Sequence, residues 1–162
     1  MNTDALRKKI LDLAIRGKLV PQDPDDEPAS ALLECIRTEK QQMVKDGKLK
    51  KKDIKNDTVI YVGEDNLHYE KFQDGTVKCI EDEIPFELPE GWCWTRLASI
   101  CIKVTDGTHH SPENYPTGEY KYITAKNVKS DGVLLDDITY VASDVHNEIF
   151  ARCNPEFGDI LY

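Results

Sequence analysis

The spacing of apolar residues changes near residue 56, and this change divides the chain of 162 residues into two kinds of structure. Before it, apolar positions recur every three or four residues, which predicts helices. After it, short runs rich in β-branched and aromatic residues alternate with glycine, proline and Asp-Gly pairs, which predicts strands and tight turns. We therefore expect an α+β protein, with a helical region at 1–55 and a strand-rich domain at 56–162.

The first predicted helix, residues 4–16, carries apolar residues on two sides. Asp4 is placed to cap its start and Gly17 to end it. One face consists of Leu6, Ile10, Leu13 and Ala14, and a second, narrower stripe consists of Leu11 and Ile15. A helix that is apolar on two sides has to bury both. We expect one neighbour to be the next helix and the other to be a distant part of the protein or another subunit.

A second helix is predicted at 29–46, with Gly47 as its stop. Its apolar face would comprise Ala29, Leu32, Leu33, Ile36 and Met43. Two helices with a short polar joint predict an N-terminal helical hairpin. The five lysines that follow fit either a solvated, mobile linker or a set of phosphate contacts; they are Lys48, Lys50, Lys51, Lys52 and Lys55.

Strands are predicted at 58–62, 67–72, 76–80, 120–124 and 133–141. Asp74-Gly75 and Asp131-Gly132 predict tight turns between them. Prolines favour an extended path at 84–91, a short helical turn follows around 97–100, and 105–119 reads as a long loop. Ser143 is placed to cap a helix that ends near 151, and a turn is expected at 154–159. Residues 160–162 look like the first strand of an interrupted domain.

Charge is distributed unevenly along the chain, whose net charge is −9. Residues 1–55 hold 13 Lys/Arg and 10 Asp/Glu, a net +3, whereas residues 56–162 hold 8 and 20, a net −12. Proteins that bind nucleic acid through phosphates alone normally show a basic surface. The acidic second part therefore requires that positive groups cluster on one face, or that partner subunits supply most phosphate contacts.

Neither the cysteines nor the hydropathy indicates an exported or membrane protein. Five cysteines occur without a C-x-x-C pair, which favours reduced thiols packed as small apolar side chains over a zinc site. No apolar run approaches the length of about 20 residues that a membrane-spanning helix needs. Charged residues interrupt the N-terminal apolar positions, so no signal peptide is predicted.

Five segments carry recognisable motifs. Residues 6–20 have the form L-R-x-x-I-L-x-x-A-x-x-G-x-L-V, residues 89–97 the form P-x-G-W-x-W-x-x-L, and residues 105–109 read T-D-G-T-H. Residues 122–128 read Y-I-T-A-K-N-V, and residues 158–161 read G-D-I-L. In this order the motifs resemble the specificity (S) subunit of type I restriction-modification enzymes: the first its spacer helix, and the other four its target recognition domain.

The resemblance implies a non-catalytic subunit that reads double-stranded DNA in defence against foreign DNA, and it implies work in the cytoplasm. In that family two recognition domains each read half of a split target, and paired helices hold them apart and dock the methyltransferase subunits. The resemblance places S-adenosylmethionine on the methyltransferase subunits and ATP and Mg on the partner subunits, with no cofactor on this chain. The match covers one helical region and an incomplete recognition domain, as in a fragment of such a subunit.

Two groups of residues are the candidate contacts with DNA. The first is the polar loop Thr105, Asp106, Thr108, His109, His110 and Ser111; the second is Thr124, Lys126, Asn127 and Lys129. Asn127 is suited to pair with an adenine edge, and the lysines with phosphates or guanine. The alternative is that Asp106 and Thr108 only close turns within the loop. For docking to partner subunits the candidates are Leu6, Ile10, Leu11, Leu13 and Ile15.

Two other functions stay open. One is an assembly module that binds subunits and not DNA, which the two-sided first helix favours. The other is a metal-dependent nuclease built on Asp136 and Asp137, but adjacent strand residues face opposite ways and are poor joint ligands. The same argument disfavours His109 and His110 as a metal pair. Trp92 and Trp94 fit core packing better than base stacking.

Overall fold

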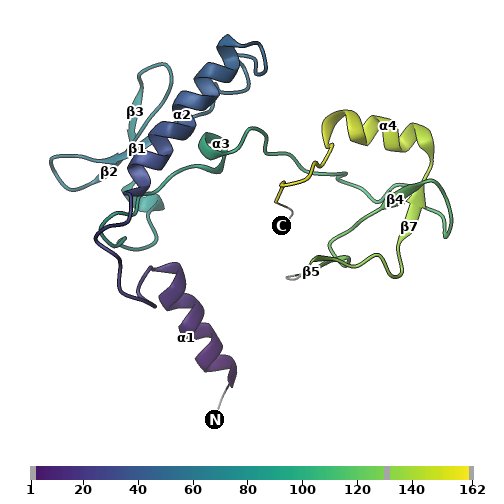
Figure 1. Cartoon of the computed structure of the whole chain (residues 1–162), viewed down its shortest axis with the longest axis horizontal. Coiled ribbons are helices and arrows are strands. Elements are labelled where there is room, and N and C mark those ends of the chain that lie inside the picture. Colours follow the sequence, from purple (N-terminus) through teal and green to yellow (C-terminus); the bar gives the residue numbers. More distant parts are fainter. Residues whose placement is uncertain (1–2, 130–131, 161–162) are drawn as a thin grey trace. The chain divides into compact units, whose positions relative to one another are not determined.

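The computed structural model describes residues 3–129 and 132–160, and within them it has the expected α+β composition of helices and short antiparallel strands (Figure 1). The chain forms two compact units, Met1–Val104 and Thr105–Tyr162. The functional boundary expected at 55/56 is thus not a boundary between compact units. The reason is that side chains of the helical region are built into the packing of the sheet and turns that follow it.

Two helices open the first unit, α1 (Thr3–Ile15) and α2 (Ala29–Lys45). Both end in the same way, with a glycine in the left-handed region: Gly17 has φ +64° and Gly47 has φ +74°. At Gly17 the N–H of Lys18 donates to Leu13 O at 2.7 Å and that of Gly17 to Ala14 O at 3.0 Å, which is a Schellman motif. Both stops were predicted. Asp4 lies inside the first turn of α1, one residue after the position at which the helix begins.

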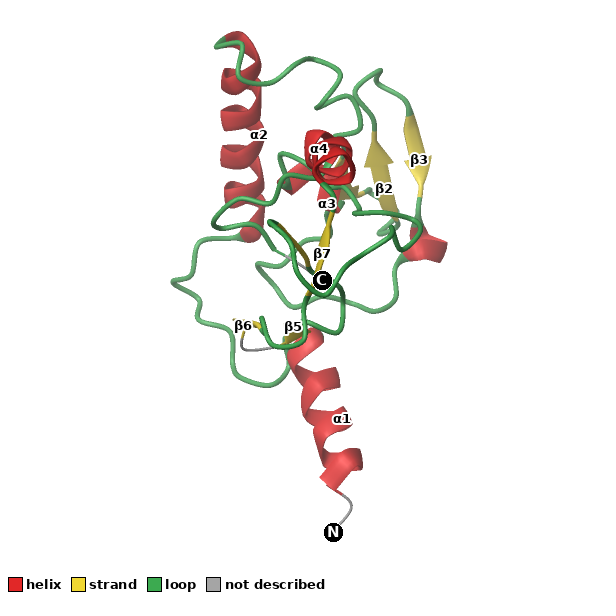
Figure 2. Ribbon diagram, turned by 90° about the vertical axis from the view of Figure 1, so that its right-hand side faces the viewer, coloured by secondary structure: helices red, strands yellow, loops and turns green. Residues whose placement is uncertain are grey.

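The predicted helical hairpin is not the packing that the structure shows. In both views α1 stands away from α2 (Figures 1 and 2), and the helix that packs on α2 is the short α3 (Leu97–Ile100). The side of α2 turned inward includes Leu33, Ile36 and Met43, as expected, but Leu32 is 54% exposed. The inward side also holds Lys40, which is only 4% exposed and was not predicted.

A three-stranded antiparallel sheet follows, with the order β1 (Val59–Val62), β2 (His68–Lys71), β3 (Val77–Cys79). The β2–β3 turn lies at Asp74-Gly75 as predicted, with Gly75 at φ +86° and the Asp74 carboxylate accepting from the Thr76 N–H at 2.8 Å. The β1–β2 turn uses Asn66, at φ +62°, which no sequence motif marked as a turn. A short 3-10 helix, η1 (Glu81–Glu83), leads to the proline-rich segment.

The extended segment 84–96 packs against the end of α1, so that two of the sequence motifs meet. A Cβ atom on Gly17 would lie 2.7 Å from Pro89 Cγ and 3.1 Å from Trp92 Cζ2. The Trp92 indole N–H donates to Gln22 Oε1 at 2.7 Å, and the Gln22 amide in turn donates to Gly17 O at 2.7 Å. Trp92 is nevertheless 45% exposed, whereas Trp94 is more covered and contacts Phe86 edge to face at 5.2 Å.

In its described residues, the second unit has two small antiparallel pairs and one helix. β4 (Tyr120–Tyr122) pairs with β7 (Thr139–Val141), and β5 (Val128–Lys129) pairs with β6 (Gly132–Val133). The single strand predicted at 133–141 is interrupted by a turn at Asp136-Asp137, where Asp137 has φ +55°. In α4 (Ser143–Arg152) the N-cap residue is Ala142, so Ser143 does not cap it as predicted. His146 of α4 stacks on Tyr120 of β4 at 4.0 Å.

Two predictions concern residues that the structure describes only in part. Asp131 of the predicted Asp131-Gly132 turn lies outside the described residues, as do Leu161 and Tyr162 of the predicted final strand. Ile160 is not in a strand. The turn expected at 154–159 is present, because the Asp159 N–H donates to Glu156 O at 3.1 Å.

Few side chains are fully buried. In the described ranges the buried apolar residues are Ile80 and Val141, and the buried polar ones are Lys40, Asp57, Thr58, Glu70 and Asn127. All five cysteines are free thiols, but Cys35 and Cys79 are exposed instead of packed. Burial raises the pKa of the Cys93 thiol. Among the described residues, no helix is both long and apolar enough to cross a bilayer.

Candidate nucleic-acid interface

The polar loop at 105–111 is fixed to α4 by a single acid. The Asp106 carboxylate accepts from Arg152 Nη1 at 2.7 Å, and Arg152 also donates to Gly107 O. The imidazole of His109 lies 3.3 Å from the same carboxylate. Asp106 therefore organises the loop from within, which is the role that turn-forming acids often have.

The remaining side chains of the loop face solvent to different degrees. Thr105, His109, His110 and Ser111 are exposed, and Thr108 is half-buried. The Ser111 hydroxyl lies 3.5 Å from the Tyr122 hydroxyl of β4, and the Thr105 hydroxyl donates to Asp106 O at 3.3 Å. The loop therefore presents two imidazoles and several hydroxyls on a backbone that Arg152 anchors, which is a set of donors and acceptors able to meet base edges.

Asn127, a predicted DNA contact, lies inside the fold. Its side chain is buried, with the residue 3% exposed. The amide oxygen accepts from the N–H and the hydroxyl of Thr124, both at 3.2 Å, and the amide nitrogen donates to Leu134 O at 3.2 Å. A buried amide that makes three hydrogen bonds within the fold is not free to pair with an adenine edge. Asn127 instead ties the segment after β4 to the segment after β6.

The two lysines of the segment 124–129 are exposed, and Thr124 is half-buried. Lys126 Nζ lies 3.3 Å from Asp137, whose side chain is 93% exposed, so this pair is weak and open to exchange. Lys129 forms no ion pair with any residue in the described ranges. These lysines remain available to an anion, although residues 105–162 as a whole carry four Lys/Arg against ten Asp/Glu, a net charge of −6.

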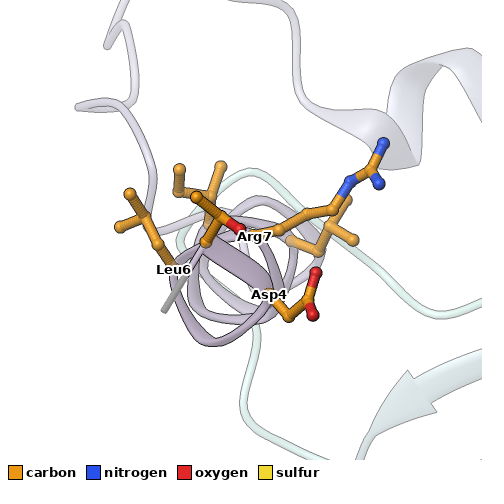
Figure 3. A pocket seen from close by; sticks show the side chains of 6 residues that line it. Asp4, Leu6 and Arg7 are labelled. Carbon is orange, nitrogen blue, oxygen red and sulfur yellow. The ribbon is translucent and has the colours of Figure 1, made fainter. Parts of the chain in front are cut away.

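The candidate docking residues lie on α1, where most of the apolar side chains are exposed. Leu6, Ile10, Leu11 and Ile15 are 43–62% exposed, and Leu13 is half-buried. An open hollow on α1 is lined by Thr3, Asp4, Leu6, Arg7, Ile10 and Leu11 (Figure 3). In that view Leu6 and Arg7 project to different sides of the helix axis. The expectation that the next helix covers one apolar side is wrong, because α2 packs on α3.

Two buried polar clusters in the first unit were not predicted. Lys40 Nζ lies 2.7 Å from Asp57 and donates to Ala98 O at 2.8 Å and Cys101 O at 3.0 Å. The signal that marks it is its position on the apolar side of α2, four residues after Ile36 and three before Met43. A lysine at such a position either extends its ammonium group to solvent or pairs inside the fold.

The second cluster centres on Arg96, which follows the tryptophans in the motif at 89–97. Its guanidinium group binds both oxygens of buried Glu70, at 3.0 and 2.6 Å, and Glu83 at 2.6 Å. Thr58 adds a hydroxyl donor to Glu70 at 2.6 Å. These bonds lower the pKa of Glu70, with Arg96 the largest cause, and burial opposes the shift. The cluster joins the proline-rich segment to β2 and has no sequence signal beyond the residue types.

Within the described residues, no group of three or more His, Cys, Asp or Glu side chains is arranged to hold a metal ion. Asp137 binds Lys126, and His109 is bound to Asp106. The geometry thus gives no support to the nuclease alternative.

Comparisons with known proteins identify two related sequences. The chain is 47% identical over 106 residues to the specificity subunit of the type I restriction enzyme EcoEI from Escherichia coli, covering 62% of this chain and 14% of that subunit. It is 36% identical over 144 residues to the EcoAI specificity subunit from the same organism, covering 89% of this chain and 21% of that subunit. No family model matches the chain. No solved structure matches it.

The chain thus spans about a fifth or less of the length of the curated relatives it matches. The identity nevertheless extends over most of the present chain and is far above the level expected between unrelated sequences. The homologues of this chain are therefore type I restriction enzyme specificity subunits, and the resemblance that its sequence motifs indicated is confirmed.

Proposed function

We propose that this chain takes part in reading a sequence of double-stranded DNA for a type I restriction-modification complex, and that it performs no chemistry itself. Methyltransferase and restriction subunits would act on the DNA that it selects. S-adenosylmethionine, ATP and Mg would belong to those partners, and the place of work would be the cytoplasm. The names of its homologues support the class of complex.

The observation that carries the proposal is the loop at 105–111. Arg152 holds its backbone through Asp106 and Gly107, while His109 and His110 remain exposed. A rigid support for exposed donors and acceptors is what direct reading of base edges requires. Lys126 and Lys129 would add phosphate contacts beside base contacts from the loop.

The test compares two changes in a specificity subunit that contains this sequence, assembled with its methyltransferase subunits. His109→Ala with His110→Ala should leave the fold unchanged and reduce the preference for the cognate site by roughly 5- to 150-fold, the effect of losing about 1–3 kcal/mol of base discrimination. Methylation of cognate and mismatched duplexes measures this preference. Unchanged preference would show that the histidines do not read DNA.

Asn127→Ala is the matched comparison, because the Asn127 amide is buried and makes its hydrogen bonds within the second unit. It should destabilise the second unit by leaving the Thr124 N–H and Leu134 O without their partner. Circular dichroism and proteolysis of the variant would show that loss. A folded Asn127→Ala subunit that loses only discrimination would return Asn127 to the interface.

The uncovered apolar face of α1 and the acidic second unit favour a second candidate, an assembly module that binds subunits without binding DNA alone. Fluorescence anisotropy of duplex DNA, in titrated salt, separates the two when measured with and without the methyltransferase subunit. Binding that appears only with the partner indicates shared reading. Leu6→Glu with Ile10→Glu should abolish the partner's effect, whichever candidate is correct.

A further inference from the structure

We propose that the turn after α2 is a phosphate-binding element for duplex DNA. The lysine turn, as we name it, consists of Lys48, Lys50, Lys51, Lys52 and Lys55. It lies beyond the C-terminal end of α2, at the top of Figure 1. The inference rests on the proposed function, because it takes DNA as the polyanion, and it adds a contact that lies outside the recognition loop.

The lysine turn has a defined backbone. The Schellman motif at Gly47 starts it, with the Lys48 N–H donating to Met43 O at 2.9 Å. The Asp53 carboxylate accepts from the Lys50 N–H at 2.8 Å, and the Asp53 N–H donates to Lys50 O at 2.8 Å. This reciprocal pair closes a local turn that holds the lysines on a short arc of chain.

Both ends of the turn are tied to the packing of the first unit. Leu49 and Ile54 are half-buried, although their neighbours are exposed. Asp57, just after the turn, is buried with Lys40, and its N–H donates to Ile54 O at 3.0 Å. The arrangement differs from a free linker, because the backbone that carries the lysines is anchored at each side.

The lysine side chains lack internal partners. All five are exposed, and none forms an ion pair or side-chain hydrogen bond with a residue in the described ranges. The two nearby acids are engaged otherwise: Asp46 accepts from the Gln42 amide at 2.8 Å, and Asp53 accepts from the Lys50 backbone. Residues 45–55 hold six lysines and two acids, a net +4 in a chain of net −9.

This charge pattern fits a phosphate backbone better than a base edge. Lysine is a compact charge on a flexible stem, suited to phosphates, whereas base reading favours groups with fixed geometry. A cluster of like charges collects counterions, and a row of phosphates that displaces them gains the entropy of their release. Because the residues outside this turn carry a net charge of −13, the strongest attraction to DNA is expected at the turn.

The experiment measures binding of the complete chain to a random-sequence duplex by fluorescence anisotropy across a range of salt. The variant is Lys50→Gln, Lys51→Gln and Lys52→Gln, which leaves the backbone bonds of the turn intact. Each lost phosphate contact should lower the magnitude of the slope of log affinity against log salt concentration by about one. For three contacts, the ratio of wild-type to variant affinity should fall about 40-fold between about 50 and 200 mM salt.

The control variant is Lys9→Gln, Lys18→Gln and Lys71→Gln, three exposed lysines dispersed over the first unit with the same change in net charge. This control should change the slope of log affinity against log salt concentration by less than about one. Equal effects of the two variants would reduce the proposal to a general charge effect and overturn it. An unchanged salt dependence in the lysine-turn variant, or no binding by the wild-type chain at low salt, would also overturn it.

Two further arms separate this proposal from others. Phosphatidylserine vesicles that bind the wild type but not the variant, with DNA binding unaffected, would assign the turn to a membrane surface and refute the proposal. The lysine-turn variant could show a reduced salt dependence of DNA affinity in a subunit that has no preference for the cognate sequence. That result would refute the proposed function and support the lysine turn. A subunit that prefers the cognate sequence, combined with an unaltered salt dependence in the lysine-turn variant, would support the proposed function and refute the lysine turn.

Discussion

Lys40 lies on the inward side of α2 and brings its ammonium group to Asp57 and to the carbonyl oxygens of Ala98 and Cys101. Three segments far apart in sequence thus meet at one nitrogen atom. The carbonyl groups at the end of α3 lack intrahelical donors, and the lysine satisfies them at the negative end of that helix. The side chains of Lys40 and Asp57 are 5% and 9% exposed, so solvent screens the pair only weakly.

Lys40→Met should destabilise the first unit by about 3 kcal/mol, because it leaves Asp57 buried without a counter-charge. Lys45→Met, an exposed position on the same helix, should change the free energy of unfolding by less than about 0.5 kcal/mol. Urea unfolding measures both. Adding Asp57→Asn to Lys40→Met should recover part of the loss, and equal stability of the two single variants would contradict the role given to Lys40.

Glu70 makes the stability of the first unit depend on pH. In the folded state Arg96 holds the pKa of this carboxyl below its ordinary value of 4.5. A depressed folded pKa gives stability that is present above the unfolded pKa and is lost as the pH falls through the folded one. Unfolding free energy should therefore decline as the pH is lowered below about 4.5.

Glu70→Gln should lower the free energy of unfolding at neutral pH by about 1–3 kcal/mol. It should also reduce the further loss of this free energy as the pH is lowered. Some decline should remain, because hydrogen bonds also lower the pKa of Glu81 and Glu83. Urea unfolding at a series of pH values gives the slope, and Glu64→Gln, an exposed residue in the β1–β2 turn, serves as the control. A slope identical in wild type and Glu70→Gln would contradict this origin of the acid sensitivity.

Among the helices, strands and turns, features set by residues a few positions apart could be predicted from the sequence, whereas features set by distant residues could not. The stops at Gly17 and Gly47 and the turn at Asp74-Gly75 are set by residues within a few positions, and the sequence motifs predicted them correctly. The break at Asp137 was missed because an Asp-Asp pair is a weak turn signal beside an apolar run. The choice of α3 as partner of α2 depends on contacts across about 60 residues, which periodicity does not encode.

The same limit applies to the candidate interface. Residue types selected the loop at 105–111 correctly as a polar, largely exposed segment. They did not separate Asn127 from its exposed neighbours, because an asparagine that reads a base and one that bonds backbone groups have the same chemistry. The positions of the Thr124 N–H and hydroxyl and of Leu134 O place the Asn127 amide inside the fold, and the residue type alone does not give them.

The junction between α1 and the proline-rich segment yields a prediction from two matched glycines. Gly17 and Gly47 both have left-handed φ values and both end a helix, but only at Gly17 would a Cβ meet Pro89 and Trp92. Gly47→Ala should cost about 1–2 kcal/mol for the backbone alone. Gly17→Ala should cost about 1–3 kcal/mol more, since overpacking adds to it.

Urea unfolding gives the two stabilities, and tryptophan fluorescence reports on the surroundings of Trp92 together with those of Trp94. The emission of Gly17→Ala should shift relative to wild type, while that of Gly47→Ala should not. Equal losses in the two variants would mean that the contact of Gly17 with the proline-rich segment does not contribute to stability.

On the scale of the whole molecule, the helical region is not separable from the sheet that follows it. Lys40 needs Asp57 and the end of α3, and Gly17 packs on Pro89 and Trp92, so the contacts that stabilise the first unit extend to residue 101. The second unit is held by its own contacts, among them Arg152 with Asp106 and Asn127 with Leu134. The proposed recognition loop and the proposed docking helix thus belong to units with separate internal networks.

A fragment of residues 1–104 should therefore fold alone and unfold cooperatively in urea, with a stability close to that of the first unit in the complete chain. A fragment of residues 1–55 should not, because it retains Lys40 without Asp57, and Gly17 without Pro89 and Trp92. Circular dichroism and hydrogen exchange would compare the two. A cooperative 1–55 fragment would establish the helical region as a domain in its own right, since its buried lysine would then have found other partners.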